Sequence, residues 1–171
     1  MFTKNIFFLN FKQKAPSKSI NKKLKYIINN KNEVINSLSL NYKNSFDSKK
    51  LKKKYNNLNF RVIGMGGSVL GTQTIYDFLK RKIKKKFVFI DNLQALRKKP
   101  YQKKFTNLIV SKSGNTIETI ANSNILIKKQ DKNIFITENK SNYLKILAQK
   151  LKSEIIHHNN YIGGRYSVLS E

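Results

Sequence analysis

The chain has 171 residues, of which 35 are Lys or Arg and 9 are Asp or Glu, so its formal net charge is +26. It contains no cysteine, which excludes disulfides, a thiolate nucleophile and cysteine-rich zinc sites. No apolar stretch is long enough to cross a bilayer and no convincing signal peptide is present, so we expect a cytoplasmic protein with one ordinary core.

The N-terminal stretch predicts helices. Apolar residues recur there at spacings of three and four, which is typical of one face of a helix. They are Ile20, Leu24, Ile27, Ile28, Val34, Ile35 and Leu38. Residues 47–59 are rich in lysine and predict a short helix or a linker. We therefore expect residues 1–57 to form a helical extension that packs against the domain that follows, residues 58–171.

Strand-like and helix-like patterns alternate from residue 58 onward. This alternation predicts an α/β fold with a doubly wound, flavodoxin-like sheet of five parallel strands joined by right-handed crossovers. The predicted strands are residues 60–64, 87–90, 107–111, 133–137 and 154–157. In the common strand order 2-1-3-4-5, the ligand-binding crevice lies between the first and third strands, at their carboxyl ends.

Helical spacing also predicts which residues the helices bury. The helix after the first strand is expected to bury Leu70, Ile75, Phe78, Leu79 and Ile83. The helix after the third strand is expected to bury Ile117, Ile120, Ala121 and Ile125. Ser141 is the candidate N-cap of the helix after the fourth strand.

Two loops meet at the expected crevice. Residues 64–68 place three glycines and a serine between the first strand and its helix, and glycine lets a ligand approach the backbone N–H groups closely. A helix start leaves its first N–H groups unpaired at the positive end of the helix dipole. Residues 111–116 add three hydroxyls, a lysine and a glycine. Together the loops indicate a ligand that carries a phosphate group.

Other nucleotide and hydrolase motifs fit the first loop poorly. Val69 stands where a dinucleotide fingerprint has its third glycine, and no Gly-Lys-Ser or Gly-Lys-Thr completes a P-loop. Leu70 stands where the serine-hydrolase elbow has its second glycine. Asp91, which closes the second strand, resembles the acid that binds ribose in dinucleotide sites, so a dinucleotide remains an alternative ligand.

Three segments resemble successive signatures of the glucose-6-phosphate isomerase (phosphoglucose isomerase) family, in its first sugar-isomerase (SIS) domain. They are residues 64–68, 111–119 and 163–167. The third segment is the most particular to this family. The resemblance implies reversible isomerisation of glucose 6-phosphate and fructose 6-phosphate through a cis-enediol, in glycolysis and gluconeogenesis, without a metal or an organic cofactor. It also implies a homodimer.

The resemblance assigns roles to individual residues. Positions that hold the substrate phosphate correspond to Gly67, Ser68, Ser111, Lys112, Ser113 and Thr116. Arg165 corresponds to the catalytic arginine beside the developing enediolate, whose negative charge a fixed cation stabilises. Glu118 occupies the acidic position of the motif and is expected to help order the site, although a helix dipole also favours glutamate there. His157 and His158 do not match the ring-opening histidine, so we expect them to be strand-end residues.

The family has a second SIS domain, which supplies the base, the ring-opening histidine and a C-terminal lysine. This chain ends at Glu171, soon after the arginine signature, and therefore resembles a truncated fragment that is inactive alone. A non-catalytic sugar-phosphate-binding SIS module remains an alternative. A lysine-rich nucleic-acid-binding protein is less favoured, because only four of the 35 basic residues are arginine, the residue that binds phosphate bidentately.

Overall fold

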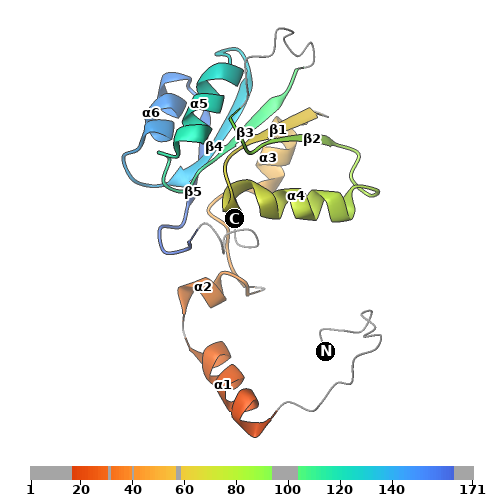
Figure 1. Ribbon diagram of the computed structural model, residues 1–171, viewed down its shortest axis with the longest axis vertical. Coiled ribbons are helices and arrows are strands. Elements are labelled where there is room, and N and C mark those ends of the chain that lie inside the picture. The colour runs from red at the N-terminus through yellow and green to blue at the C-terminus, as the bar shows by residue number, and fades with distance from the viewer. Residues whose placement is uncertain (1–16, 31, 40, 57–58, 94–103, 164–171) are drawn as a thin grey trace.

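The computed structural model describes residues 17–30, 32–39, 41–56, 59–93 and 104–163. A five-stranded, all-parallel sheet with the order β2-β1-β3-β4-β5 forms its centre (Figure 1). The strands are β1 (Asn59–Ile63), β2 (Lys86–Ile90), β3 (Thr106–Val110), β4 (Lys132–Glu138) and β5 (Glu154–His158). The predicted order is confirmed, and every strand end lies within one residue of its predicted position.

Helices cover both faces of this sheet. Three helices connect strands, namely α4 (Gly67–Leu79), α5 (Ile117–Leu126) and α6 (Tyr143–Lys150). The chain runs outward from β1 in one direction and from β3 in the other, so right-handed crossovers place α4 on one face and α5 and α6 on the opposite face (Figure 1). None of the helices in the described ranges has the length and apolar character that crossing a membrane requires.

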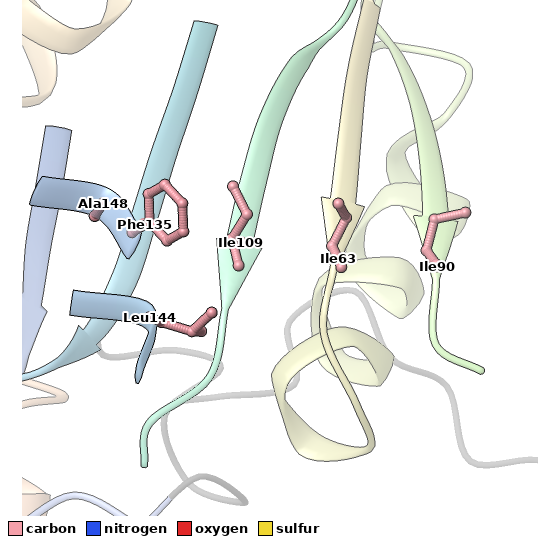
Figure 2. Packing of buried hydrophobic residues seen from close by; sticks show 6 residues of the cluster. All are labelled: Ile63, Ile90, Ile109, Phe135, Leu144 and Ala148. Atoms are coloured by element: carbon pink, nitrogen blue, oxygen red, sulfur yellow. The ribbon is translucent and has the colours of Figure 1, made fainter. Parts of the chain in front are cut away.

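The main core fills the space between the sheet and α6. Strand register sets four apolar side chains from neighbouring strands side by side, and Leu144 and Ala148 of α6 pack against this row (Figure 2). The four are Ile90, Ile63, Ile109 and Phe135. Ile63 is the last residue of β1 and Ile109 the last but one of β3, so this packing fixes the strand ends from which both glycine and hydroxyl loops start.

A second cluster lies on the opposite face of the sheet, beneath α3 (Ser48–Lys54). Tyr55, which follows α3, packs with Ile134 and Ile156, and residues 46 and 51 pack against the same cluster. The Tyr55 hydroxyl and the Lys54 ammonium both donate hydrogen bonds to the Glu154 carboxylate. The later part of the predicted extension therefore packs on β4 and β5, as expected.

The earlier part of the extension behaves differently. It forms α1 (Lys18–Asn29) and α2 (Glu33–Asn36), at the places where helical spacing predicts them. Neither of these two helices buries a residue in the described structure, and both lie away from the sheet (Figure 1). The expectation that this part also packs against the domain is not met within the described residues.

The buried face of α4 differs from the predicted stripe. Phe78 is 86% exposed, and Leu70 and Ile75 are exposed as well. Tyr76 packs instead on the aromatic rings of β2, with ring centroids 5.1 Å from Phe87 and 5.8 Å from Phe89. A helix with apolar residues on several sides offers more than one candidate stripe, and here the aromatic surface of β2 selects the side that carries Tyr76.

The prediction for α5 is also wrong in part. Ile117 is 76% exposed and Ile125 is exposed, whereas polar residues occupy the buried side of the helix. Those residues are Thr119, Asn122 and Ser123. The Asn122 amide donates to the Asn92 carbonyl at 2.9 Å, so a hydrogen bond to the loop after β2 holds this side of α5 inward. Spacing of apolar residues carries no information about such a polar contact.

The start of α6 is built around Asn142. This residue, and not the predicted Ser141, is the N-cap, and its side-chain oxygen accepts a hydrogen bond from the Lys145 N–H at 2.9 Å. Its amide donates to the Thr137 hydroxyl at 3.1 Å. A serine and an asparagine are both good caps. The buried bond to Thr137, a partner on β4, favours Asn142.

The loop after β3 rests directly on this helix start. The Gly114 carbonyl accepts from the Leu144 N–H at 3.1 Å, and the Asn115 side chain accepts from the Tyr143 N–H at 3.0 Å. Gly114 has a φ of 66°, and a Cβ at this position would lie 2.0 Å from the Asn142 side-chain oxygen. The loop and α6 therefore satisfy each other's backbone groups, and only glycine fits where they meet.

Replacing Gly114 with alanine should destabilise the domain by about 3 kcal/mol, because the new methyl group meets the buried Asn142 cap and the backbone is left-handed. Urea denaturation followed by circular dichroism measures this loss. Ser113→Ala is the matched control in the same loop. Ser113 is exposed, so a change within about 0.5 kcal/mol is expected. Equal stability of the two variants would contradict the close packing at Gly114.

The Glu154 cluster makes stability depend on pH. The hydrogen bond from Lys54, aided by that from Tyr55 and opposed by partial burial, holds the pKa of the Glu154 carboxyl below its ordinary value of 4.5. The unfolded chain therefore takes up this proton at a higher pH than the folded chain does. The stabilisation is complete above the unfolded pKa and is lost as the pH falls through the folded pKa.

We therefore expect Glu154→Gln to lower the free energy of unfolding by about 1 kcal/mol at pH 7 and to lessen its decline below about pH 4.5. Urea denaturation between pH 3 and pH 7 tests both effects. Glu33→Gln, at an exposed position on α2, serves as the control and should keep the full decline. A Glu154→Gln profile parallel to that of the unchanged chain would refute the role of the cluster.

Candidate functional site

The two glycine and hydroxyl loops leave neighbouring strands at the same level of the sheet. Ile63 of β1 pairs with Ile109 of β3, so both loops begin at the carboxyl edge of the sheet and lead directly into α4 and α5. A Cβ at Gly64 would lie only 2.8 Å from the Val110 carbonyl and 3.3 Å from the Ser68 Cβ. The glycine therefore allows the first loop to pass close to the end of β3.

The N-terminus of α4 carries no side-chain cap. Its N-cap is Gly66, which has φ 54° and ψ −122°, and Gly67 and Ser68 open the first turn. The Ser68 N–H donates to the Met65 carbonyl at 3.2 Å and the Val69 N–H to the Gly66 carbonyl at 3.0 Å, so within the described residues the Gly67 N–H is the first-turn donor left without an acceptor at the positive end of the helix dipole. Gly67 and Ser68 are both half-buried there.

The second loop joins two of the predicted hydroxyls. Ser111 is 2% exposed, and its Oγ lies 3.0 Å from the Thr116 Oγ1 and accepts a hydrogen bond from the Gly114 N–H at 3.2 Å. Thr116 is the N-cap of α5, yet its hydroxyl makes no capping bond to that helix. Threonine at this position ordinarily caps the helix. Here it bonds to Ser111 instead, so the N-terminus of α5, like that of α4, has no side-chain cap.

Lys112 and Ser113 occupy the bend between these hydroxyls. The Lys112 carbonyl accepts from the Thr137 hydroxyl at 3.1 Å and from the Glu138 N–H at 3.0 Å, which ties the bend to β4. The Lys112 ammonium donates to the Asn160 carbonyl at 2.8 Å. Ser113 is exposed, and its hydroxyl accepts from the Asn115 N–H at 3.3 Å.

Several backbone donors of the site have no acceptor in the part of the chain that the structure describes. They are the N–H groups of Lys112 and Ser113 in the loop, and of Ile117, Glu118 and Thr119 at the start of α5. Successive unpaired N–H groups at a helix start form a concave site for an anion. The site can therefore offer a phosphate group backbone donors, neighbouring hydroxyls and two helix dipoles.

The remaining predicted residues lie in different places. Glu118 is half-buried in the first turn of α5, and its carboxylate forms no hydrogen bond or ion pair with the described residues. His157 and His158 end β5, as expected, and the His158 Nε2 lies 3.1 Å from the Ile162 carbonyl oxygen. Arg165 lies outside the described residues, so its geometry and its role remain predictions.

The structure adds three residues that the sequence patterns did not reveal. Asn115, Thr137 and Asn142 hold the second loop through the bonds to Tyr143, Lys112 and the start of α6 described above. Each was visible only as a polar residue near a strand end or a helix start. Their hydrogen-bond partners lie on other elements, so the spacing of residues along the chain could not indicate that they hold the second loop.

Comparisons with known proteins point to one family. The sequence profile of the phosphoglucose isomerase family matches residues 17–171. A glucose-6-phosphate isomerase of Methanocaldococcus jannaschii is 33% identical over 152 residues, which cover 81% of this chain and 36% of that relative. The corresponding enzyme of Acholeplasma laidlawii is 32% identical over 143 residues, covering 71% and 33%. The chain thus spans about a third of the length of these relatives.

Two solved structures share the fold. A hypothetical protein from Thermus thermophilus superposes with a TM-score of 0.60 at 22% identity, over 89% of this chain and 40% of the other. A tagatose-6-phosphate ketose/aldose isomerase from Escherichia coli superposes with a TM-score of 0.55 at 13% identity, over 71% and 38%. The fold, the match over residues 17–171 and the identity to the two isomerases lead to one conclusion: the chain belongs to the phosphoglucose isomerase family.

Proposed function

We propose that this chain supplies the phosphate-binding part of a glucose-6-phosphate isomerase, which interconverts glucose 6-phosphate and fructose 6-phosphate in glycolysis and gluconeogenesis. One observation carries the proposal. The helices α4 and α5 start beside each other without side-chain caps, and the threonine that should cap α5 bonds to Ser111 instead. The names and the identity of the two curated relatives support the choice of substrate.

The phosphate group would sit on the open helix starts. A sugar phosphate is close to a dianion at neutral pH, so the unpaired N–H groups of the second loop and of α5 would donate to its oxygens in charge-assisted hydrogen bonds. The hydroxyls of Ser111 and Thr116 lie 3.0 Å apart and can rotate so that both donate to the ligand. Ser68, at the start of α4, and Ser113, in the loop after β3, would add hydroxyl donors. Gly67 would add a backbone donor.

The phosphate-binding groups do not act on the sugar carbons, so other groups must carry out the chemistry at C1 and C2. Arg165 would place a fixed positive charge beside the enediolate that forms when a proton moves between C1 and C2. Glu118, at the start of α5, would help order the donors around it. The general base and the ring-opening group match no residue of this chain. We assign both to the part of the family's length that the chain does not span, together with the homodimer interface.

Replacing both Ser111 and Thr116 with alanine should weaken binding of fructose 6-phosphate about a hundredfold, because two hydrogen bonds to a charged group are lost. Calorimetric titration of the purified chain at moderate salt measures this change. Free fructose serves as the ligand control and should not bind. Thr74→Ala is the matched variant, because the Thr74 hydroxyl is exposed and, among the residues that the structure describes, bonds within α4 to the Leu70 carbonyl. Unchanged affinity in the double variant would count against the phosphate site.

The purified chain should not interconvert the two sugar phosphates at a measurable rate, because it lacks the base. A coupled assay that follows glucose 6-phosphate formed from fructose 6-phosphate tests this point. Turnover at an ordinary enzymatic rate would show that a residue of this chain acts as the base. It would also contradict the assignment of that role to the rest of the family's length.

A further inference from the structure

Lys112 makes a contact that phosphate binding does not explain. Its ammonium donates a hydrogen bond of 2.8 Å to the backbone carbonyl of Asn160, in the loop that follows β5. We propose that Lys112 is a positioning residue that ties the phosphate-binding loop to the loop leading to Arg165, and that the two loops act as one unit. This inference rests on the proposed function for its consequence, although the tie itself does not.

The tie is anchored at both ends. At one end, the Thr137 hydroxyl and the Glu138 N–H hold the Lys112 carbonyl, so the backbone of the lysine is fixed to the end of β4. In the sheet, β4 lies between β3 and β5. The Lys112 side chain therefore spans the carboxyl end of β4 and joins the loops that follow the two strands on either side of it.

At the other end, the chain makes a tight turn. The Ile162 N–H donates to the Asn159 carbonyl at 3.2 Å, and the Ile162 side chain is fully buried. The His158 ring contacts the Ile162 carbonyl, and the Asn159 amide donates to the Tyr42 hydroxyl. The Asn160 carbonyl thus lies on a turn that is already held in place. Gly163 is the last residue described after β5, and Arg165 follows it by two positions in the sequence.

The chemistry of lysine suits this task. A lysine ammonium is a compact charge with three donors on a flexible stem, and a carbonyl oxygen that receives such a donor forms a charge-assisted hydrogen bond. The backbone donors and the hydroxyls already provide for a phosphate. The ammonium can therefore link the end of the site that holds the phosphate to the segment that carries the arginine. Loss of this link should lower the affinity for a ligand that carries a negative charge at the sugar carbons more than the affinity for phosphate alone.

The first test measures the tie without a ligand. Lys112→Met keeps the aliphatic stem and removes the donors, so hydrogen exchange of the backbone amides in residues 159–163 should quicken about tenfold. Lys112→Arg retains a donor and should restore most of the protection. Lys150→Met is the matched control, because Lys150 is exposed in the last turn of α6 and has no partner within the described residues. Unchanged exchange in Lys112→Met would overturn the tie.

The second test compares two ligands by calorimetry. Inorganic phosphate probes the phosphate site alone, and 5-phosphoarabinonate adds a carboxylate where the enediolate charge would develop. Lys112→Met should weaken the binding of 5-phosphoarabinonate about tenfold and the binding of inorganic phosphate less than twofold. In an Arg165→Ala background, Lys112→Met should cause no further loss, because the lysine acts through the arginine.

Each other result has a distinct meaning. An equal loss for both ligands would make Lys112 a direct phosphate ligand, and a loss that persists in the Arg165→Ala background would break the link to Arg165. Either result overturns the inference. If the unchanged chain binds neither ligand while the exchange result holds, the tie stands. The proposed function then fails, and with it the effect on Arg165.

Discussion

The pairing of β1 with β3 is the constraint on which the rest of the site depends. The chain reverses direction after β2 and places β3 on the other side of β1, as doubly wound sheets commonly do. Two crossover helices therefore start beside each other on opposite faces of the sheet. The row of buried side chains that includes Ile63 and Ile109 fixes the level at which both loops begin.

The second loop forms its hydrogen bonds with α6 and within itself, so the N–H groups at the start of α5 stay available to a ligand in the crevice. Gly114 and Asn115 satisfy the first N–H groups of α6, and Asn142 caps the same helix, so the second loop has a set conformation before any ligand arrives. The start of α5 receives no such partner, because Thr116 bonds to Ser111. The start of α6 is thus used for structure, while the first N–H groups of α5 are left without an acceptor among the described residues.

The segment before β1 has two parts: the part near α3 packs on the sheet, and the helices α1 and α2 do not. Residues close to α3 pack on β4 and β5 through Tyr55 and the Glu154 cluster, and the Ser45 hydroxyl donates to the His157 carbonyl. The helices α1 and α2 bury no residue in the described structure. The segment near α3 therefore supports the strand that precedes Asn160 and the turn to which Lys112 is tied.

Local pattern in the sequence was sufficient for the strands and the two loops, because alternation and glycine placement are properties of neighbouring residues. The strand order was taken from the order common to this fold class, and the structure has that order. Local pattern also marked the hydroxyls of Ser111 and Thr116 as members of one site. Tertiary structure alone decided which sides of α4 and α5 are buried, that Asn142 and not Ser141 caps α6, and that Lys112 reaches Asn160. Each of these outcomes depends on a partner far along the chain, and only the packed sheet brings such partners within hydrogen-bonding or packing distance.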